Sequence, residues 1–155
     1  MAETQITNPL GYHRTVSDFT TGVDAQGEEI AYGSIVRHYR ANVAIAQGEV
    51  VTFTVATATV PLSLVLATAG SSIKMVALEA AAAGEQCAVV VEGHARVLCT
   101  ATAVTFGDSL IVSATAGSAA AAAEDATTVV GTVLGIAVGA KGGTAGFTLC
   151  YVHNL

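Results

Sequence analysis

The chain has no tryptophan, only two prolines and few charged or aromatic side chains. Of its 155 residues, 12% are charged and 5% are aromatic, whereas 52% are hydrophobic. Ordinary soluble domains carry about 25% charged residues. Small residues, above all Ala, Val, Thr and Gly, dominate the composition instead. Val and Thr favour strands because a branched Cβ fits a pleated surface better than a helix, so the sequence predicts a mainly β protein.

Positive charge is scarce as well. Six Lys and Arg face twelve Asp and Glu, which gives a formal net charge of −6. Proteins that bind nucleic acid cluster their cations, since the affinity comes from counterions released by phosphate contacts. The six cations here are scattered, so we expect no direct nucleic-acid partner.

Long hydrophobic runs are also absent. The stretch 129–138 is interrupted by Gly and Thr and is far shorter than the ~20 residues of a membrane helix, and the polar start does not resemble a secretion signal. We therefore expect a soluble chain that is made in the cytoplasm and has no membrane partner. The three cysteines, Cys87, Cys99 and Cys150, are expected to be buried and reduced, because an odd number does not suit a disulfide framework.

Two regions differ in composition. Residues 1–33 are polar, without a sustained apolar period, and cannot bury enough surface to fold alone. We expect an extended N-terminal arm that orders on a partner, with Tyr12, His13, Arg14 and Phe19 as its anchors. Residues 34–155 are expected to form the β-rich core domain.

Short apolar runs separated by turn residues fill this core domain, as in a small β-sandwich or barrel-like fold. The expected strands are 34–41, 50–56, 62–68, 73–78, 86–91, 95–100, 109–114, 129–138 and 146–152. The alanine-rich stretches 77–86 and 117–126 leave room for at most one or two short helices, the second with Ser118 as N-cap.

A weak internal repeat supports the strands. "AQGEVVTFTV", "AAGEQCAVVV" and "TFGDSLIVSA" each place Gly and an acidic residue before an apolar run. Gly48, Gly84 and Gly107 are therefore expected in turns with φ > 0, which only glycine adopts without cost. Unequal spacing argues against a solenoid and favours recurring units in one domain.

One stretch, "EGHARVLC", gathers a histidine, an arginine and a cysteine. Cys87, His94 and Cys99 could be read as metal ligands, but a fourth ligand and a tight pair such as C-x2-C are missing. A hairpin with its tip at Gly93 explains the stretch better, since it pairs Val91 with Ala95 and Cys87 with Cys99 on one apolar face. That hairpin would leave His94 exposed at the tip.

Two further stretches carry weak signals of chemistry. In "SSIKM", Ser71, Ser72 and Lys74 could suggest a Ser/Lys pair, yet closeness in sequence does not aim a hydroxyl at an amine. The glycine-rich "GAKGGTAGF" lacks the order of a phosphate-binding loop and reads as a turn between strands. We predict no catalytic residue, no metal site and no cofactor, and hence no enzyme.

The strand "IVRHYRAN" is more informative. It places Arg37, Tyr39 and Arg40 in a chain with few charges, and Arg and Tyr are enriched where proteins meet. Charges that guard an exposed sheet edge would look the same in sequence. Both interpretations stay open.

The polar arm and the stretches "AIAQGEVV", "AAAAGEQCAVVVEGHARV", "VTFGDSLIVSATAG" and "TVVGTVLGIAVGAKGGTAGFTLCYV" together resemble the head decoration, or capsid cement, proteins of tailed bacteriophages. The resemblance covers roughly residues 43–152. It implies a small β-rich homotrimer on the outer capsid surface of the virion, which binds the major capsid protein and clamps its subunits. It also implies that the arm orders against the capsid or a neighbouring subunit.

A second hypothesis is a head-fibre or tail-associated β module that binds a host surface glycan. Sugar sites usually expose Trp or Tyr for stacking, and this chain has no Trp and four Tyr. The capsid decoration role is therefore preferred, with contacts expected at the arm and at Arg37, Tyr39 and Arg40.

Overall fold

The structure is a computed structural model that describes residues 5–7, 13–15, 22–23, 29–30, 34–54, 62–122 and 133–153. These residues form strands and connecting segments without a helix. The strands are β1 (Gln5–Thr7), β2 (His13–Thr15), β3 (Gly22–Val23), β4 (Glu29–Ile30), β5 (Ile35–Arg40), β6 (Val50–Phe53), β7 (Leu64–Leu66), β8 (Met75–Ala77), β9 (Gln86–Cys99), β10 (Ser109–Val112), β11 (Ala119–Ala121), β12 (Val133–Ala137) and β13 (Gly146–Val152). The prediction of a mainly β fold is confirmed.

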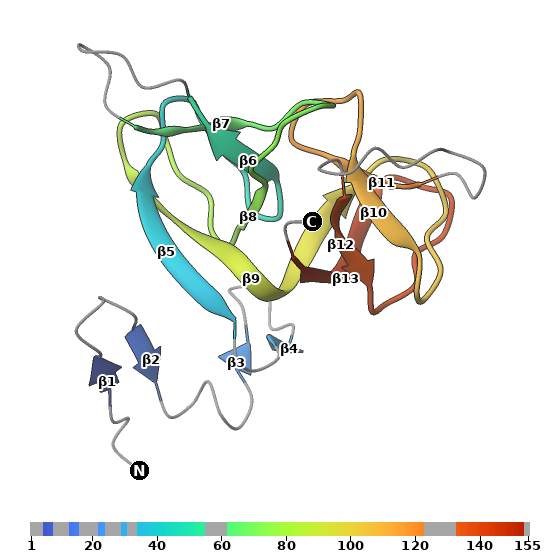
Figure 1. The fold of residues 1–155 in the computed structure, drawn as a ribbon, viewed down its shortest axis with the longest axis horizontal. Coiled ribbons are helices and arrows are strands. Elements are labelled where there is room, and N and C mark those ends of the chain that lie inside the picture. Colours follow the sequence, from blue (N-terminus) through green and yellow to red (C-terminus); the bar gives the residue numbers. More distant parts are fainter. Residues whose placement is uncertain are drawn as a thin grey trace.

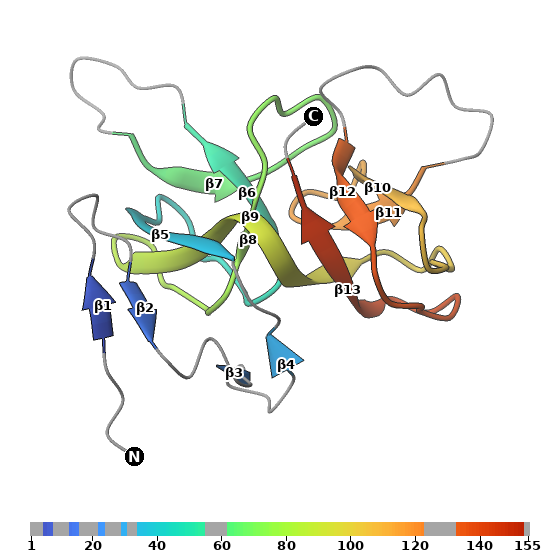
Figure 2. The same cartoon turned by 60° about the horizontal axis from the view of Figure 1, so that its bottom comes forward.

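The long strand β9 connects two lobes (Figure 1). Its first half pairs with β5 and β8, and its second half pairs with β13. Each lobe is a closed barrel. The first barrel is formed by β5, the first half of β9, β8, β6 and β7, and a parallel bridge between Ala41 and Leu64 closes it. The second barrel is formed by the second half of β9 with β13, β12, β10 and β11, and a parallel pairing of Ala119 with Cys99 closes it. Figure 2 shows β9 passing from one lobe to the other.

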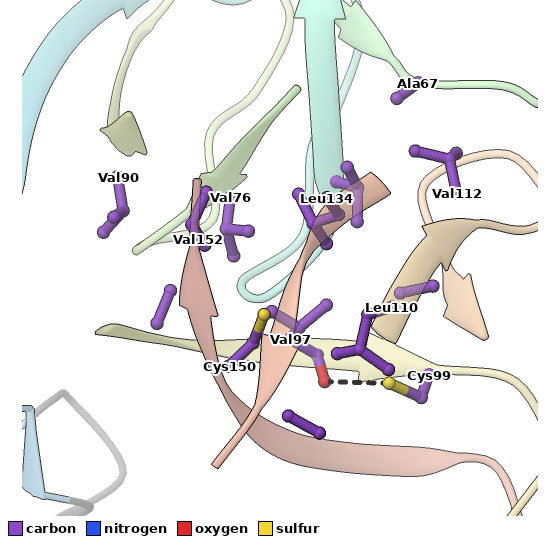
Figure 3. Close-up of a cluster of buried hydrophobic side chains, with 14 of the residues drawn as sticks. Ala67, Val76, Val90, Val97, Cys99, Leu110, Val112, Leu134, Cys150 and Val152 are labelled. Carbon is purple, nitrogen blue, oxygen red and sulfur yellow. Dashed lines mark hydrogen bonds between the residues drawn. The ribbon is translucent and has the colours of Figure 1, made fainter. Parts of the chain in front are cut away.

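Each barrel has its own apolar core. Inside the first barrel lie Val51, Leu64 and Met75 with Cys87 and Val89 of β9. The core of the second barrel contains Val97, Leu110, Leu134 and Cys150 and continues to Val50, Val76 and Val90, which come from strands of the first barrel (Figure 3). Because side chains alternate along a strand, β9 serves both cores.

The predicted hairpin at Gly93 is wrong. Residues 86–99 form one continuous strand, and the expected partners on either side of Gly93 lie along the same strand instead of facing each other. Gly93 does adopt φ +112°, yet the chain bends there without reversing. A Cβ on this residue would lie 2.5 Å from the Cα of Ser34, so glycine is required by the close passage of Ser34.

The predicted turn glycines are confirmed. Gly48, Gly84 and Gly107 have φ of +79°, +92° and +92°. Each is the third residue of a turn in which the fourth residue donates its N–H to the first carbonyl, as in 46–49, 82–85 and 105–108, and the segments 68–71 and 115–118 repeat this turn. The acidic side chain also has a structural role, since the carboxylates of Glu49, Glu85 and Asp108 accept the backbone N–H three residues earlier at 2.7 to 3.0 Å.

The alanine-rich stretches are not helical in the described residues. Ala119–Ala121 is strand β11, and the segment 78–85 consists of an isolated bridge and turn. The expected helix after Ser118 is wrong because β10 pairs with this stretch in an antiparallel ladder. Tertiary pairing overrides the helix preference of alanine here.

The two barrels repeat one another. Their strands follow the same order of pairing, and equivalent backbone hydrogen bonds recur at an almost constant shift in sequence. The matched bonds are Asn42 to Leu64 with Thr100 to Ala119, Ile45 to Ala81 with Val104 to Lys141, Gly48 to Ala77 with Gly107 to Ala137, Leu78 to Ala88 with Val138 to Leu149, and Ala67 to Val50 with Ala122 to Ser109. The fold is therefore a tandem duplication in which β9 ends the first barrel and begins the second.

Candidate functional site

The Cys/His set of β9 does not form a metal centre. Cys87 belongs to the core of the first barrel and Cys99 to that of the second, and a strand rises about 3.3 Å per residue. The two thiols therefore lie at opposite ends of β9, with His94 between them. Within the described ranges, no group of three or more His, Cys, Asp or Glu residues could hold a metal ion.

Burial makes the three thiols poor nucleophiles. It raises the pKa of Cys87 and of Cys99 to about 11, and the pKa of Cys150 to about 12. The nearby Glu79 carboxylate raises that of Cys87 further. All three cysteines are unpaired and buried, as the sequence predicted, and a protonated thiol neither attacks nor ligates readily.

The Ser/Lys stretch does not form a catalytic pair. Lys74 is fully buried, and its Nζ donates to the backbone carbonyls of Ser71 and Ser72 at 3.4 and 3.1 Å. Desolvation lowers the pKa of Lys74. The Ser71 hydroxyl accepts the N–H of Thr68 within a turn, so the lysine fixes a loop before β8.

The predicted contact residues of β5 differ in exposure. Tyr39 is half-buried on the rim of the first core and packs edge-to-face on Phe53, with ring centroids 4.8 Å apart. Arg37 is partly buried, whereas Arg40 is exposed beside the turn at Gly84. On its edge away from β9, β5 meets only the bridge of Ala41 with Leu64 among the described strands. A role for these side chains in contacts stays a prediction.

Two of the four predicted arm anchors lie in a strand. His13 and Arg14 lie in β2, which pairs with β1, while Tyr12 and Phe19 lie outside the described residues. The domain boundary at residue 33 likewise stays a prediction.

An unpredicted surface lies on the outer face of β9 and β13. The register pairs Phe147 with Leu98 and Tyr151 with His94. The guanidinium of Arg96 lies 4.4 Å from the centroid of the Phe147 ring, and the rings of His94 and Tyr151 meet edge-to-face at 5.1 Å. Phe147 and Tyr151 are 40% and 37% exposed. Such aromatic and arginine side chains are typical anchors of interfaces.

This surface could have been found in the sequence. The alternation in "GFTLCYV" places Phe147 and Tyr151 on one side of a strand and Thr148, Cys150 and Val152 on the other. The sequence did not identify the partner strand of β13, because the expected hairpin paired the second half of β9 with its first half.

The described residues contain no helix that is long and apolar enough to cross a membrane.

A solved structure shares the fold of this chain. No protein-family model matches the chain, and no curated protein sequence matches it either. Among solved structures, the chain is similar to the N base of the head fibre protein gp8.5 of bacteriophage phi29. The TM-score is 0.53 at 14% sequence identity, and the match covers 79% of this chain and 96% of that chain. The two chains therefore share a fold over most of their lengths.

Proposed function

We propose that this chain is a structural protein of a tailed-bacteriophage head, without catalytic activity. In this proposal it binds the outer surface of the assembled head as a decoration protein and stabilises contacts between major capsid subunits. The observation that carries the proposal is the fold shared with a head fibre base across 79% of this chain. The resemblance of the sequence to capsid cement proteins supports the same setting.

The chemistry of the described residues suits binding better than catalysis. The buried thiols have raised pKa values, whereas Arg96, Phe147 and Tyr151 lie on an outer strand face. Binding to the assembled lattice and not to separated subunits would stabilise the shell by mass action. Repeated copies on one shell would add multivalency.

A second candidate is the base of a head fibre that displays a binding module for a host glycan. The matched structure is itself the base of a head fibre, so the shared fold supports this candidate as well as the decoration role. Phe147 and Tyr151 are partly exposed aromatic side chains, the kind of side chain against which a pyranose could pack. Specific binding of a glycan by the isolated protein would favour this candidate.

Co-sedimentation with expanded, undecorated heads of the phage that encodes the chain tests the proposal. We expect saturable binding of the full chain and weaker binding after deletion of residues 1–30. Full binding by the deleted chain would refute the role of the arm. A Tyr151→Ala variant examines the outer face of β13 in parallel, and circular dichroism of each variant shows whether the β fold is retained.

A further inference from the structure

The two barrels meet where a turn of the first barrel lies against a strand edge of the second. Because the barrels repeat one another, each also has the equivalent of the surface that its neighbour contributes to this contact. Within the chain, the turn 46–49 of the first barrel lies against the edge of the second half of β9. The carbonyl of Gly48 accepts the N–H of Leu98 at 2.8 Å, Val50 N–H donates to the carbonyl of Gly117 at 2.8 Å, and Gly117 N–H donates to the carbonyl of Ala67 at 2.9 Å. The first barrel thus contributes a turn surface and the second barrel an edge surface.

The second barrel has an equivalent turn surface. Gly107 matches Gly48, and Ser109 and Ala122 match Val50 and Ala67, because Ala122 donates to Ser109 as Ala67 donates to Val50. The carbonyl of Gly107, the N–H of Ser109 and the carbonyl of Ala122 are the matching groups. Over the described part of the chain, none of them binds another residue. Beside them, Phe106 at the tip of the turn is 76% exposed.

The first barrel has an equivalent edge surface. Arg40 matches Leu98, because Arg40 pairs with Gln86 as Leu98 pairs with Phe147. Leu62 matches Gly117, because Thr54 donates to Ser63 as Ser113 donates to Ser118.

Both residues of this edge surface are accessible. Arg40 is exposed, and Leu62 is 49% exposed. Among the described residues, the outer edge of β5 is therefore open at the place where the matching edge of β9 receives a turn.

The side chains of these two free surfaces complement each other. In the internal contact, a Cβ on Gly117 would lie 3.2 Å from Glu49 Oε1 and 3.2 Å from Leu66 Cδ2, so little more than glycine fits there. Between the free turn surface and the free edge surface, the large side chain is on the edge and the small side chains are on the turn. Leu62 takes the place of Gly117, and the smaller Asp108 and Ala121 take the places of Glu49 and Leu66.

The aromatic ring is exchanged in the same way. In the internal contact the ring belongs to the edge surface, where Phe147 lies against Gly48, and the turn carries Gln47. In the free pair the turn carries Phe106 and the edge carries Gln86. Asp108 on the turn surface and Arg40 on the edge surface also have opposite charge. A second copy of the same chain therefore suits the free surfaces in size, ring placement and charge.

We propose that the turn surface of one copy (Phe106, Gly107, Asp108, Ser109 and Ala122) binds the edge surface of a second copy (Arg40, Leu62 and Gln86), repeating the internal contact between the barrels. Because each copy has one surface of each kind, the interface is heterologous and joins copies head to tail, into a ring when the rotation closes. The proposal depends on the duplication and not on head binding, so the two can fail separately.

Analytical ultracentrifugation of the full chain tests this interface. The wild type is expected to sediment as an oligomer, and Phe106→Asp and Arg40→Glu are each expected to sediment as monomers of 15.5 kDa. Phe106→Asp retains an intact edge surface and Arg40→Glu retains an intact turn surface, so mixing the two variants should give a heterodimer. An interface made of one self-complementary patch would not regain association in this way.

Matched variants make the test decisive. Tyr151→Ala, on the outer face of β13 and outside both surfaces, should sediment like the wild type, and Leu62→Asp repeats the loss at the edge surface if Arg40→Glu does not fold. A monomeric wild type, unchanged association of the variants, or a mixture without heterodimer would each overturn the proposal. Unchanged association with retained head binding would leave the proposed function in place.

Discussion

At the scale of single residues, burial decides what the chemical groups of this chain can do. The three cysteines, the lysine before β8 and the half-buried Tyr39 all carry functional groups that the fold uses for packing or loop fixation. The sequence predicted buried cysteines from their number and from the absence of a secretion signal. It could not predict a fully buried Lys74, because that depends on the loop carbonyls of Ser71 and Ser72.

The thiols give a prediction at this scale. At pH 8, a disulfide reagent such as Ellman's should titrate fewer than one thiol in the folded protein and all three in guanidinium. In the folded state burial raises the cysteine pKa values from 9.0 to about 11 or about 12. Three rapidly reacting thiols in the folded protein would contradict the buried sites.

The same shifts set the pH dependence. Between about pH 9 and 11 the folded chain retains thiol protons that the unfolded chain releases. The free energy of unfolding should therefore fall as pH rises through this window, by up to about 1.4 kcal/mol per pH unit for each thiol. Chemical denaturation across this range measures the slope.

At the scale of elements, the turn glycines show where local sequence is sufficient. The Gly-acid pairs predicted positive φ correctly because a turn is fixed by residues next to one another. The hairpin at Gly93 failed for the opposite reason. Its positive φ serves a close approach of Ser34 from a distant part of the sequence, and neighbouring residues contain no information about that contact.

The equivalent glycines of the two barrels allow a matched comparison. Within a single copy, Gly107→Ala places a Cβ in open space at φ +92°, so in the monomeric Phe106→Asp background it should cost only the backbone strain, about 1 to 2 kcal/mol. Gly48→Ala adds a Cβ 2.6 Å from Phe147 Cε1 and should cost at least about 1 kcal/mol more. Equal losses in urea denaturation would contradict the contact between turn 46–49 and β13.

At the scale of the whole molecule, the sequence predicted a small barrel-like β fold but not two barrels. A repeat of Gly-acid turns was visible, yet the duplication depends on hydrogen bonds between strands whose side chains have diverged, such as Ala81 and Lys141 at matching bridges. The strand predicted at 34–41 is confirmed as β5, whereas a contact role for Arg37, Tyr39 and Arg40 stays a prediction. The outer face of β9 and β13 was missed because its two strands are far apart in sequence.

Function at this scale depends on what the assembled surfaces bind. The chain shares a fold with the base of a phage head fibre, and an external role on a phage head is the proposal that the contact regions below would serve. The arm, the edge of β5 and the turn at Phe106 are then three distinct contact regions. The deletion of residues 1–30, Arg40→Glu and Phe106→Asp test these three regions separately.

Electron cryomicroscopy of expanded heads, with and without saturating amounts of the purified chain, tests the central proposal most directly. The proposal predicts added density on the outside of the shell, of the size of the two-barrel fold and bridging neighbouring capsid subunits. Identical maps with and without the protein, under conditions where the chain is folded, would contradict it.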